Sequence, residues 1–406
     1  MKRPLSIVLL LVVIMSFPSC ATAWKVADRP WSEDAMYLYL SLKTGHADFF
    51  NGVDEDVADG YVESVVEDID RMDAPQAYYS LLSIAALAHD SHTSVGMDTT
   101  LLSCFDFLPV VFDVFGDDLV IVSATTGYDH LVGCTVRSVC GHTLDQIIDA
   151  SRGLIPHDND VFLLSQLKDT HLLIRQFYEV AGLVEEGEDF FVELDDGRLF
   201  VLDAMDYDEY ASSGRTNLMQ RLPDTLNTAS YYNAMYLPDE SALLVNYLSC
   251  AQMPSFPFTD FAKACIDLIE EKGHEKVIID LRYNSGGDST VIEPLVDGLE
   301  KIRQERPLAV YVLIGEDTFS SAVLNAIELK DRLDAVLVGR PTGGSASHYG
   351  ELGRNVLPNS RLVFTWSTKW FDNGLAGPLV PDIPVARSIA DYRDGIDSDL
   401  AALGVL

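Results

Sequence analysis

Residues 31 to about 90 carry apolar side chains at three- and four-residue steps, a spacing typical of amphipathic helices. A first helix is predicted to be capped by Ser32 and to end at Gly45, because serine favours the start of a helix and glycine its end. A second helix is predicted from about Asp73. It leads into the segment Ala88-His89-Asp90-Ser91-His92-Thr93.

From about Phe107 the hydrophobic residues gather into short runs, which favour strands. Two runs, 109–115 and 119–122, flank a Gly116-Asp117-Asp118 turn and predict a hairpin. Further along we expect a strand over 135–139, a helix from Leu144, and a second hairpin around Asp195-Asp196-Gly197.

The most regular pattern lies between residues 241 and 385. Three apolar runs of buried-strand type alternate with helical stretches, and they cover Val277–Leu281, Leu308–Ile314 and Ala335–Gly339. This order predicts an α/β core of parallel strands with right-handed crossovers. Ligands bind beyond the carboxyl ends of such strands, so the loops at 282–287 and 317–322 are the places to look for chemistry.

The charge of the chain restricts its partners. Of 406 residues, 28 are Lys or Arg and 63 are Asp or Glu, which gives a formal net charge of −35. A surface this acidic repels phosphate backbones and anionic lipid, so we expect no nucleic-acid partner and no polybasic membrane docking. It favours neutral or basic substrates for the same reason.

The first residues read as an export leader. A basic start precedes an apolar run from Leu5 to Phe17, and Ala21-Thr22-Ala23 fits a small-x-small cleavage site. We therefore expect a secreted or extracytoplasmic protein that begins near Trp24. The alternative is a lipid anchor on Cys20, which would hold the protein on the outer face of the membrane.

No cofactor or metal is expected. The five cysteines after Cys20 are scattered and include no Cys-x-x-Cys pair, so they form neither a zinc site nor a disulfide framework. Walker, Gly-x-Gly-x-x-Gly and His-Glu-x-x-His motifs are absent from the sequence.

Two glycines, Gly286 and Gly287, follow the first buried strand. Their amides, ahead of a helix, suit a developing negative charge, although glycine is also the ordinary residue of a plain turn. Ser320 lies where the next strand passes into a helix, with the free first-turn amide of Ser321 beside it. It reads either as a nucleophile beside an oxyanion donor or as an ordinary helix cap.

A serine nucleophile needs a base, and three histidines are candidates: His89, His92 and His348. His89 and His92 are also spaced as a metal pair, but no third ligand pattern accompanies them. Spacing alone does not choose among the three.

Three segments, taken in order, resemble the tail-specific (C-terminal processing) serine peptidases. They are the helices ending in Asp90-Ser91-His92-Thr93, the strand Ile279-Asp280-Leu281-Arg282 with its two glycines, and Thr318-Phe319-Ser320-Ser321-Ala322 followed by Val338-Gly339-Arg340-Pro341-Thr342-Gly343-Gly344. The branch they resemble also holds the tricorn protease core and the repeats of interphotoreceptor retinoid-binding protein.

The resemblance implies a crotonase-like α/β core, a PDZ-like module and hydrolysis of peptide bonds. Ser320 falls on the family's nucleophile, and Gly286 or Gly287 with the amide of Ser321 falls on its oxyanion hole. The lysine of the family's best-known dyad is replaced here by Ser345, whereas the adjacent Ser91-His92 matches the tricorn branch.

Two assignments stay open within the resemblance. His348 is a second candidate for the base, because it follows closely on the lysine position. A carboxylate completes the tetrad of the tricorn branch, and we take Glu351 for it, with Asp382 as the alternative.

The expected organisation follows. It comprises a leader at 1–23, a helical region at 24–103, a degenerate PDZ-like module at 104–150, a mixed connecting region at 151–240 and the peptidase core at 241–406. We expect a secreted serine peptidase acting on peptides or unfolded proteins; the alternative is a non-catalytic peptide- or lipid-binding protein on the same fold. The PDZ-like module would capture an extended chain by strand addition.

Overall fold

The computed structural model describes residues 30–218, 230–237 and 241–405. The expected leader, its cleavage site after Ala23 and the alternative anchor Cys20 lie outside these residues. Nowhere in the described part of the chain does a helix combine the length and the apolar character needed to cross a membrane.

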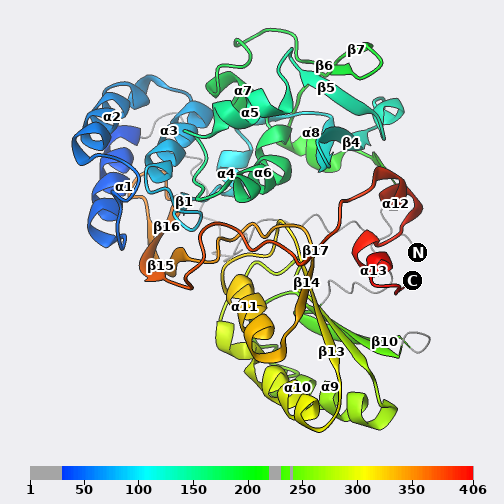
Figure 1. The fold of residues 1–406 in the computed structure, drawn as a ribbon. Coiled ribbons are helices and arrows are strands. Elements are labelled where there is room, and N and C mark those ends of the chain that lie inside the picture. The colour runs from blue at the N-terminus through cyan, green and yellow to red at the C-terminus, as the bar shows by residue number, and fades with distance from the viewer. Residues whose placement is uncertain (1–29, 219–229, 238–240, 406) are drawn as a thin grey trace.

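Helices from the start of the described chain form one end of the molecule (Figure 1). They are α1 (Trp31–Gly45), α2 (Glu55–Asp68) and α3 (Ala74–Ala86), followed by the short α4 (Thr99–Leu102). The start of α3 is confirmed, because Asp73 and Gln76 form a reciprocal capping box there. The predicted Ser32 cap is wrong: α1 begins at Trp31, and the amide and hydroxyl of Ser32 both donate to Asp70.

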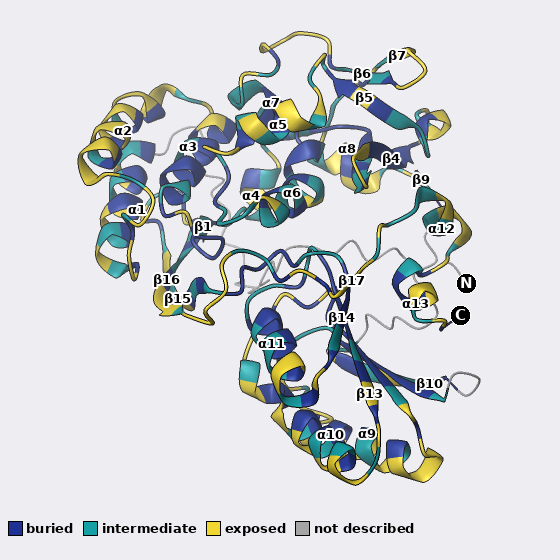
Figure 2. Cartoon of the chain, in the orientation of Figure 1, coloured by how far each residue is buried: buried dark blue, intermediate teal, exposed yellow. Residues whose placement is uncertain are grey.

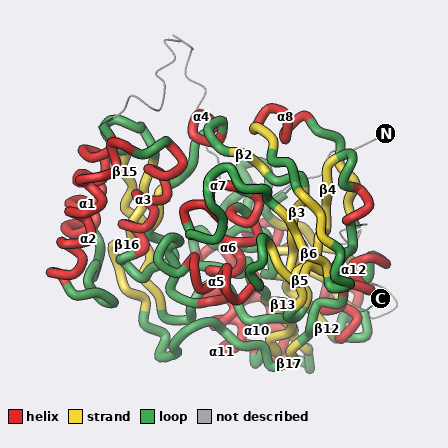
Figure 3. The backbone as a smooth tube through the Cα atoms, turned by 90° about the horizontal axis from the view of Figure 1, so that it is seen from above, coloured by secondary structure: helices red, strands yellow, loops and turns green. Residues whose placement is uncertain are grey.

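An antiparallel sheet occupies the middle of the chain and confirms both predicted hairpins. Its strands are β3 (Val110–Phe115), β4 (Asp118–Thr125), β5 (Thr135–Val139), β6 (Phe191–Leu194), β7 (Leu199–Val201) and β9 (Arg215–Asn217). The helices α5 (Leu144–Ser151), α6 (Asp160–Asp169) and α7 (Arg175–Val180) lie between this sheet and α1–α3 (Figure 3). One continuous hydrophobic core joins the sheet to the N-terminal helices. The short β2 (Asp106–Phe107) and β8 (Met205–Asp206) pair beside α8 (Tyr207–Ser212).

The predicted parallel core is confirmed. The strand order is β10 (Tyr232–Leu237), β11 (Ala242–Tyr247), β12 (Lys276–Asp280), β13 (Ala309–Ile314), β14 (Val336–Gly339) and β17 (Ile383–Pro384), with parallel pairing from β11 to β17. One face packs against α9 (Phe258–Lys272), α10 (Glu293–Glu305) and α11 (Ser321–Leu333), and the other against α13 (Ser398–Ala402). Figure 2 shows these strands buried and the outer faces of the helices exposed. Burial on both faces explains why the strands read as continuous apolar runs.

A long hairpin returns from the core to the N-terminal helices. Its strands are β15 (His348–Val356) and β16 (Val363–Phe371), and β16 also pairs with β1 (Ser94–Val95). Figures 1 and 3 both show the hairpin beside α1. The pairing of β1 with β16 fixes the segment 90–93, which immediately precedes β1, at the junction of the two halves of the molecule. After β17 the chain passes through α12 (Ile389–Asp394) to α13.

Partly buried ion pairs also connect the two halves. Glu316, just after β13, pairs with Lys168 of α6 at 3.4 Å and with Arg340 at 2.8 Å. Burial alone would raise the pKa of Glu316, but the nearby charges of Lys168, Arg340 and Arg387 hold it below its ordinary value. A carboxyl with a lowered folded-state pKa stabilises the fold above its unfolded pKa, and this stabilisation disappears as the pH falls through the folded value.

We therefore expect Glu316→Gln to lower the free energy of unfolding by about 3 kcal/mol at pH 7. Because the variant has already lost this carboxylate, the difference from wild type should shrink as the pH falls below about 4. Urea unfolding at pH 7, 5 and 3 measures both effects. Asp68→Asn, at an exposed pair with Arg71, is the control and should cost under about 1 kcal/mol. A constant Glu316→Gln difference across this pH range would contradict the assignment.

Candidate active site

The two loops singled out by the sequence meet at the carboxyl ends of β12 and β13. These strands are parallel neighbours, with Asp280 opposite Leu313. The amide of Phe319 donates to the carbonyl of Asn284 at 3.0 Å, which ties the second loop to the first. The predicted nucleophile and the two glycines therefore lie against one another.

Ser320 adopts a backbone conformation that is uncommon for a residue with a side chain. Its φ is 51° and its ψ is −126°, and its side chain makes no capping hydrogen bond to α11. The interpretation of Ser320 as an ordinary helix cap is therefore wrong. Strain of this kind costs about 1–3 kcal/mol and is characteristic of functional sites. A sharp turn between a strand and a helix also exposes the serine hydroxyl of a nucleophile elbow.

Gly286 allows the close approach of the two loops. A Cβ atom at this position would lie 2.7 Å from the Cβ of Ser320 and 3.0 Å from the amide nitrogen of Ser321, and its φ is +105°. Its own amide donates to the side chain of Asn284 at 2.9 Å, so this N–H is already engaged.

The amides of Gly287 and Ser321 are better placed as oxyanion donors. The hydroxyl of Ser321 donates to the carbonyl of Gly287 at 2.6 Å, which holds the two residues together. Within the described residues neither amide has a hydrogen-bond acceptor in the loop or the first turn of α11. First-turn amides lack helical acceptors, so such donors are available to a bound anion.

Two of the three candidate histidines lie together next to Phe319, the residue before Ser320. His92, from the segment before β1, stacks on Phe319 at 4.3 Å between ring centroids, and on His348 at 5.4 Å. Phe162 and Phe371 extend this stack at its two ends. Within the described residues, no hydrogen bond joins Ser320 to either histidine. His89 lies elsewhere, with its ring against Gly52.

The two histidines differ in their hydrogen bonds. Nδ1 of His348 lies 2.8 Å from the carbonyl of Ser345. The pKa of His348 is lowered, mainly by burial and to a smaller extent by the neighbouring His92. Both ring nitrogens of His92 are buried and have no hydrogen-bond partner among the described residues. His92 thus has ring nitrogens that are available to accept a proton.

The loop that holds His92 is attached to two other segments. Ser91 donates to the carboxylate of Asp158 at 2.5 Å and accepts from the Asp158 amide at 3.0 Å. The side-chain amide of Asn159 donates to Ser345 at 3.0 Å and to the Gly343 carbonyl at 2.8 Å. Ser345, where the best-known family branch has its lysine, is therefore a buried link in this network.

The structure does not bring the two sequence-predicted carboxylates to the histidines. The Glu351 side chain is 65% exposed on β15, with Lys369 at 3.7 Å. Asp382 accepts from Lys330 at 2.6 Å and from the amide of Leu337 at 2.9 Å. Neither makes a hydrogen bond or ion pair with His92 or His348 in the described part of the chain.

Sequence reasoning missed the carboxylate that does lie beside His92. Asp90 is buried, and its Oδ1 is 3.7 Å from Nδ1 of His92. Burial would raise the pKa of Asp90, but hydrogen bonds from His46 and Ser367, together with the nearby ring of His92, hold it well below its ordinary value. The signal was present, since Asp90 stands two residues before His92 in the segment that carries the resemblance.

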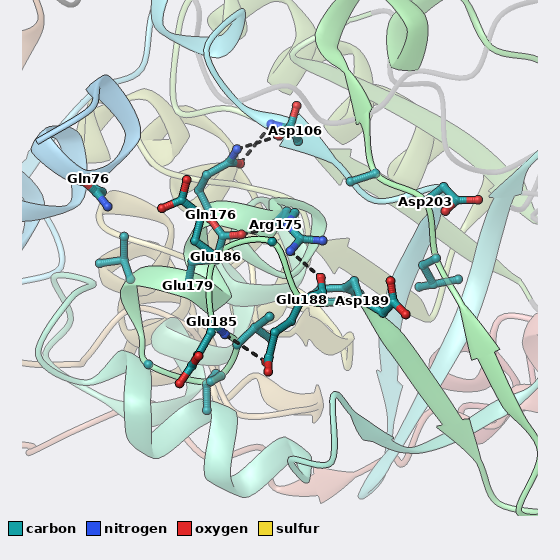
Figure 4. Close-up of a pocket in the computed structure, with 18 of the residues that line it drawn as sticks. Gln76, Asp106, Arg175, Gln176, Glu179, Glu185, Glu186, Glu188, Asp189 and Asp203 are labelled. Carbon is teal, nitrogen blue, oxygen red and sulfur yellow. Dashed lines mark hydrogen bonds and ion pairs between the residues drawn. The ribbon is translucent and has the colours of Figure 1, made fainter.

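A large acidic pocket lies apart from these residues (Figure 4). Its volume is about 1190 Å³, and its lining comes mainly from α7 and the loop after it. Carboxylates dominate this lining; they belong to Asp73, Asp106, Glu179, Glu185, Glu186, Glu188, Asp189 and Asp203. None of the predicted site residues lines it. Within the described residues, no group of three or more His, Cys, Asp or Glu side chains is arranged to hold a metal ion.

Comparison with known proteins identifies the fold. No protein-family model and no curated protein matches the chain. Among solved structures, mature CPAF in complex with lactacystin has a TM-score of 0.57 at 14% identity, over 91% of this chain and 96% of CPAF. A serine-to-alanine mutant of CPAF has a TM-score of 0.57 at 13% identity, over 91% of this chain and 95% of the mutant chain. The photosystem II D1 C-terminal processing protease has a TM-score of 0.39 at 13% identity, over 91% of this chain and 98% of the protease.

The chain thus has the mixed α/β fold, with several sheets, that mature CPAF has over nearly its whole length. At the level of the fold, this comparison confirms the resemblance to tail-specific serine peptidases.

Proposed function

We propose that this protein is a serine peptidase that hydrolyses peptide bonds, with Ser320 as nucleophile and His92 as base. The observation that carries the proposal is the conformation of Ser320. At this strand–helix junction Ser320 has a φ of 51° and makes no side-chain capping bond to α11, and it follows Phe319, on which the buried ring of His92 stacks. The amides of Gly287 and Ser321 make no backbone hydrogen bond among the described residues. The shared fold with CPAF and the resemblance to tail-specific peptidases support it.

The chemistry follows from these groups. Ser320 Oγ attacks the peptide carbonyl while His92 takes its proton, because a serine hydroxyl is a weak nucleophile at neutral pH. The amides of Gly287 and Ser321 donate to the oxygen that becomes negative. His92 then returns the proton to the leaving amine, and water hydrolyses the acyl-enzyme with the same base. No lysine is needed in this scheme.

The best test of the proposal is covalent labelling with a fluorophosphonate probe. We expect labelling of the purified protein, with the adduct on Ser320, and none in Ser320→Ala. Ser388→Ala is a matched control, because Ser388 does cap its helix through the amide of Asp391 and should label like wild type. A folded protein that takes up no probe would sink the proposal.

The alternative function is non-catalytic binding of a peptide or lipid on the same fold. It is favoured by the absence, in the described residues, of a hydrogen bond between Ser320 and either histidine. Free enzymes often hold such pairs apart until substrate binds, so the labelling experiment separates the two functions.

We also propose the assignments that rest on the sequence alone. These are the crotonase-like character of the core, the PDZ-like role of the 104–150 module in capturing an extended chain, and export of the protein, with a lipid anchor at Cys20 as the alternative. The net charge of −35 supports neutral or basic peptide substrates. Peptide turnover by a protein lacking the module tests its role.

A further inference from the structure

We propose that Asp90 is the positioning residue for His92: it holds the ring through Nδ1 and leaves Nε2 to take the proton of Ser320. The inference rests on the proposed peptidase function and assigns the carboxylate that the sequence alone left undetermined. The two oxygens of Asp90 have different surroundings.

The Oδ2 atom anchors the Asp90 carboxylate. It lies 2.6 Å from the hydroxyl of Thr93, 2.6 Å from the hydroxyl of Ser367 and 3.2 Å from Nε2 of His46. These partners come from three separate segments, and the side chain of Asp90 is only 1% exposed. Buried hydrogen bonds to an ionised group are strong and directional, so the carboxylate has one orientation.

The Oδ1 atom is left available to His92. It accepts the backbone amide of His92 at 3.0 Å, which shapes the turn between the two residues. Among the described residues this is the one hydrogen bond that Oδ1 accepts, whereas Oδ2 has three partners. Nδ1 of His92 is the nearby donor, at 3.7 Å. Closure by less than 1 Å would form the hydrogen bond, in keeping with catalytic hydrogen bonds that tighten when substrate binds.

No other carboxylate competes for His92 among the described residues. The ring of His92 faces His348 of β15. Asp158, which precedes α6, accepts a hydrogen bond from Ser91, and its charge raises the pKa of His348. His46, from the end of α1, reaches His92 only through Asp90. Asp90 is the single carboxylate in ion-pair range of His92 in this part of the chain.

The expected role is the one that carboxylates have behind catalytic histidines. A hydrogen bond from Nδ1–H fixes the tautomer in which Nε2 is unprotonated, and the negative charge stabilises the imidazolium that forms during attack. Asp90 makes no contact with substrate in this scheme. It acts through His92.

The test compares Asp90→Asn with wild type in fluorophosphonate labelling across pH 5 to 9. We expect the labelling rate to fall by roughly 10²–10⁴-fold, and its pH midpoint to move to lower pH because the imidazolium loses its counter-charge. Asp34→Asn is the matched control. Asp34 is also buried, but it holds the turn after β15 through the amides of Asn359 and Ser360, so its loss should not move the midpoint.

A second measurement does not depend on activity or on the folding of Asp90→Asn. Nitrogen-15 NMR of wild-type protein, with His92 assigned by its loss in His92→Gln, reports which ring nitrogen carries the proton. We expect Nδ1–H. Protonation of Nε2 in neutral His92, or an unchanged pH midpoint in folded Asp90→Asn, would overturn the inference. Wild-type protein that shows Nδ1–H yet fails to label would overturn the peptidase proposal and leave the Asp90–His92 pairing standing.

Discussion

Replacing His92 with glutamine is expected to lower the rate of fluorophosphonate labelling of Ser320 by about 10³–10⁴-fold or more. The reason is chemical: without an acceptor for its proton, the Ser320 hydroxyl attacks only through the small ionised fraction present at neutral pH. The ring nitrogens of His92 make no hydrogen bond in the described structure, so the fold loses packing against Phe319 and His348 and little else.

His348→Gln is the control variant for His92→Gln. His348 lies in the same stack but uses Nδ1 on the Ser345 carbonyl, and its pKa is lowered, so it carries a proton less readily than an ordinary histidine. We expect a loss at least tenfold smaller than that of His92→Gln. Equal losses in the two variants, or a larger loss in His348→Gln, would assign the base to His348. Thermal unfolding of both proteins checks that the rates compare folded molecules.

The elements of the parallel core could be predicted because local and global preferences agree there. Strands such as 277–281 are buried on both faces and therefore read as continuous apolar runs, and helical stretches alternate with them along the chain. The same local logic failed at Ser32. A long-range partner, Asp70, took both of its polar groups, and propensity does not anticipate such contacts.

The candidate site was predictable in its parts but not in its geometry. Serine before a helix is usually a cap, so only the backbone of Ser320 distinguishes the two roles. The environment of Asp90 depends on Ser367, which is 277 positions away, and on His46, which is 44 away. No motif placed the carboxylate in the sequence, and the side chain of Glu351, which was taken for it, is exposed to solvent on β15.

Replacing Gly286 with alanine is expected to lower the labelling rate of Ser320 by about 10²–10³-fold, the usual effect of losing an oxyanion donor. The new methyl group would lie 2.7 Å from Cβ of Ser320 and 3.0 Å from the amide nitrogen of Ser321, which is closer than atoms in contact allow. Something must shift. Backbone surrounds the position, so the nucleophile and the oxyanion amides are the groups that move.

The control for Gly286→Ala is Gly197→Ala in the turn between β6 and β7. Gly197 also has a positive φ, +83°, but a Cβ atom there meets nothing within 4 Å. Both variants should lose about 1 kcal/mol or more of stability, because alanine is strained in this conformation. Only Gly286→Ala should lose labelling, as measured by second-order rate constants beside urea unfolding curves. A folded Gly286→Ala protein that labels at the wild-type rate would show that this loop does not shape the oxyanion site, and the amides of Gly287 and Ser321 would lose their proposed role.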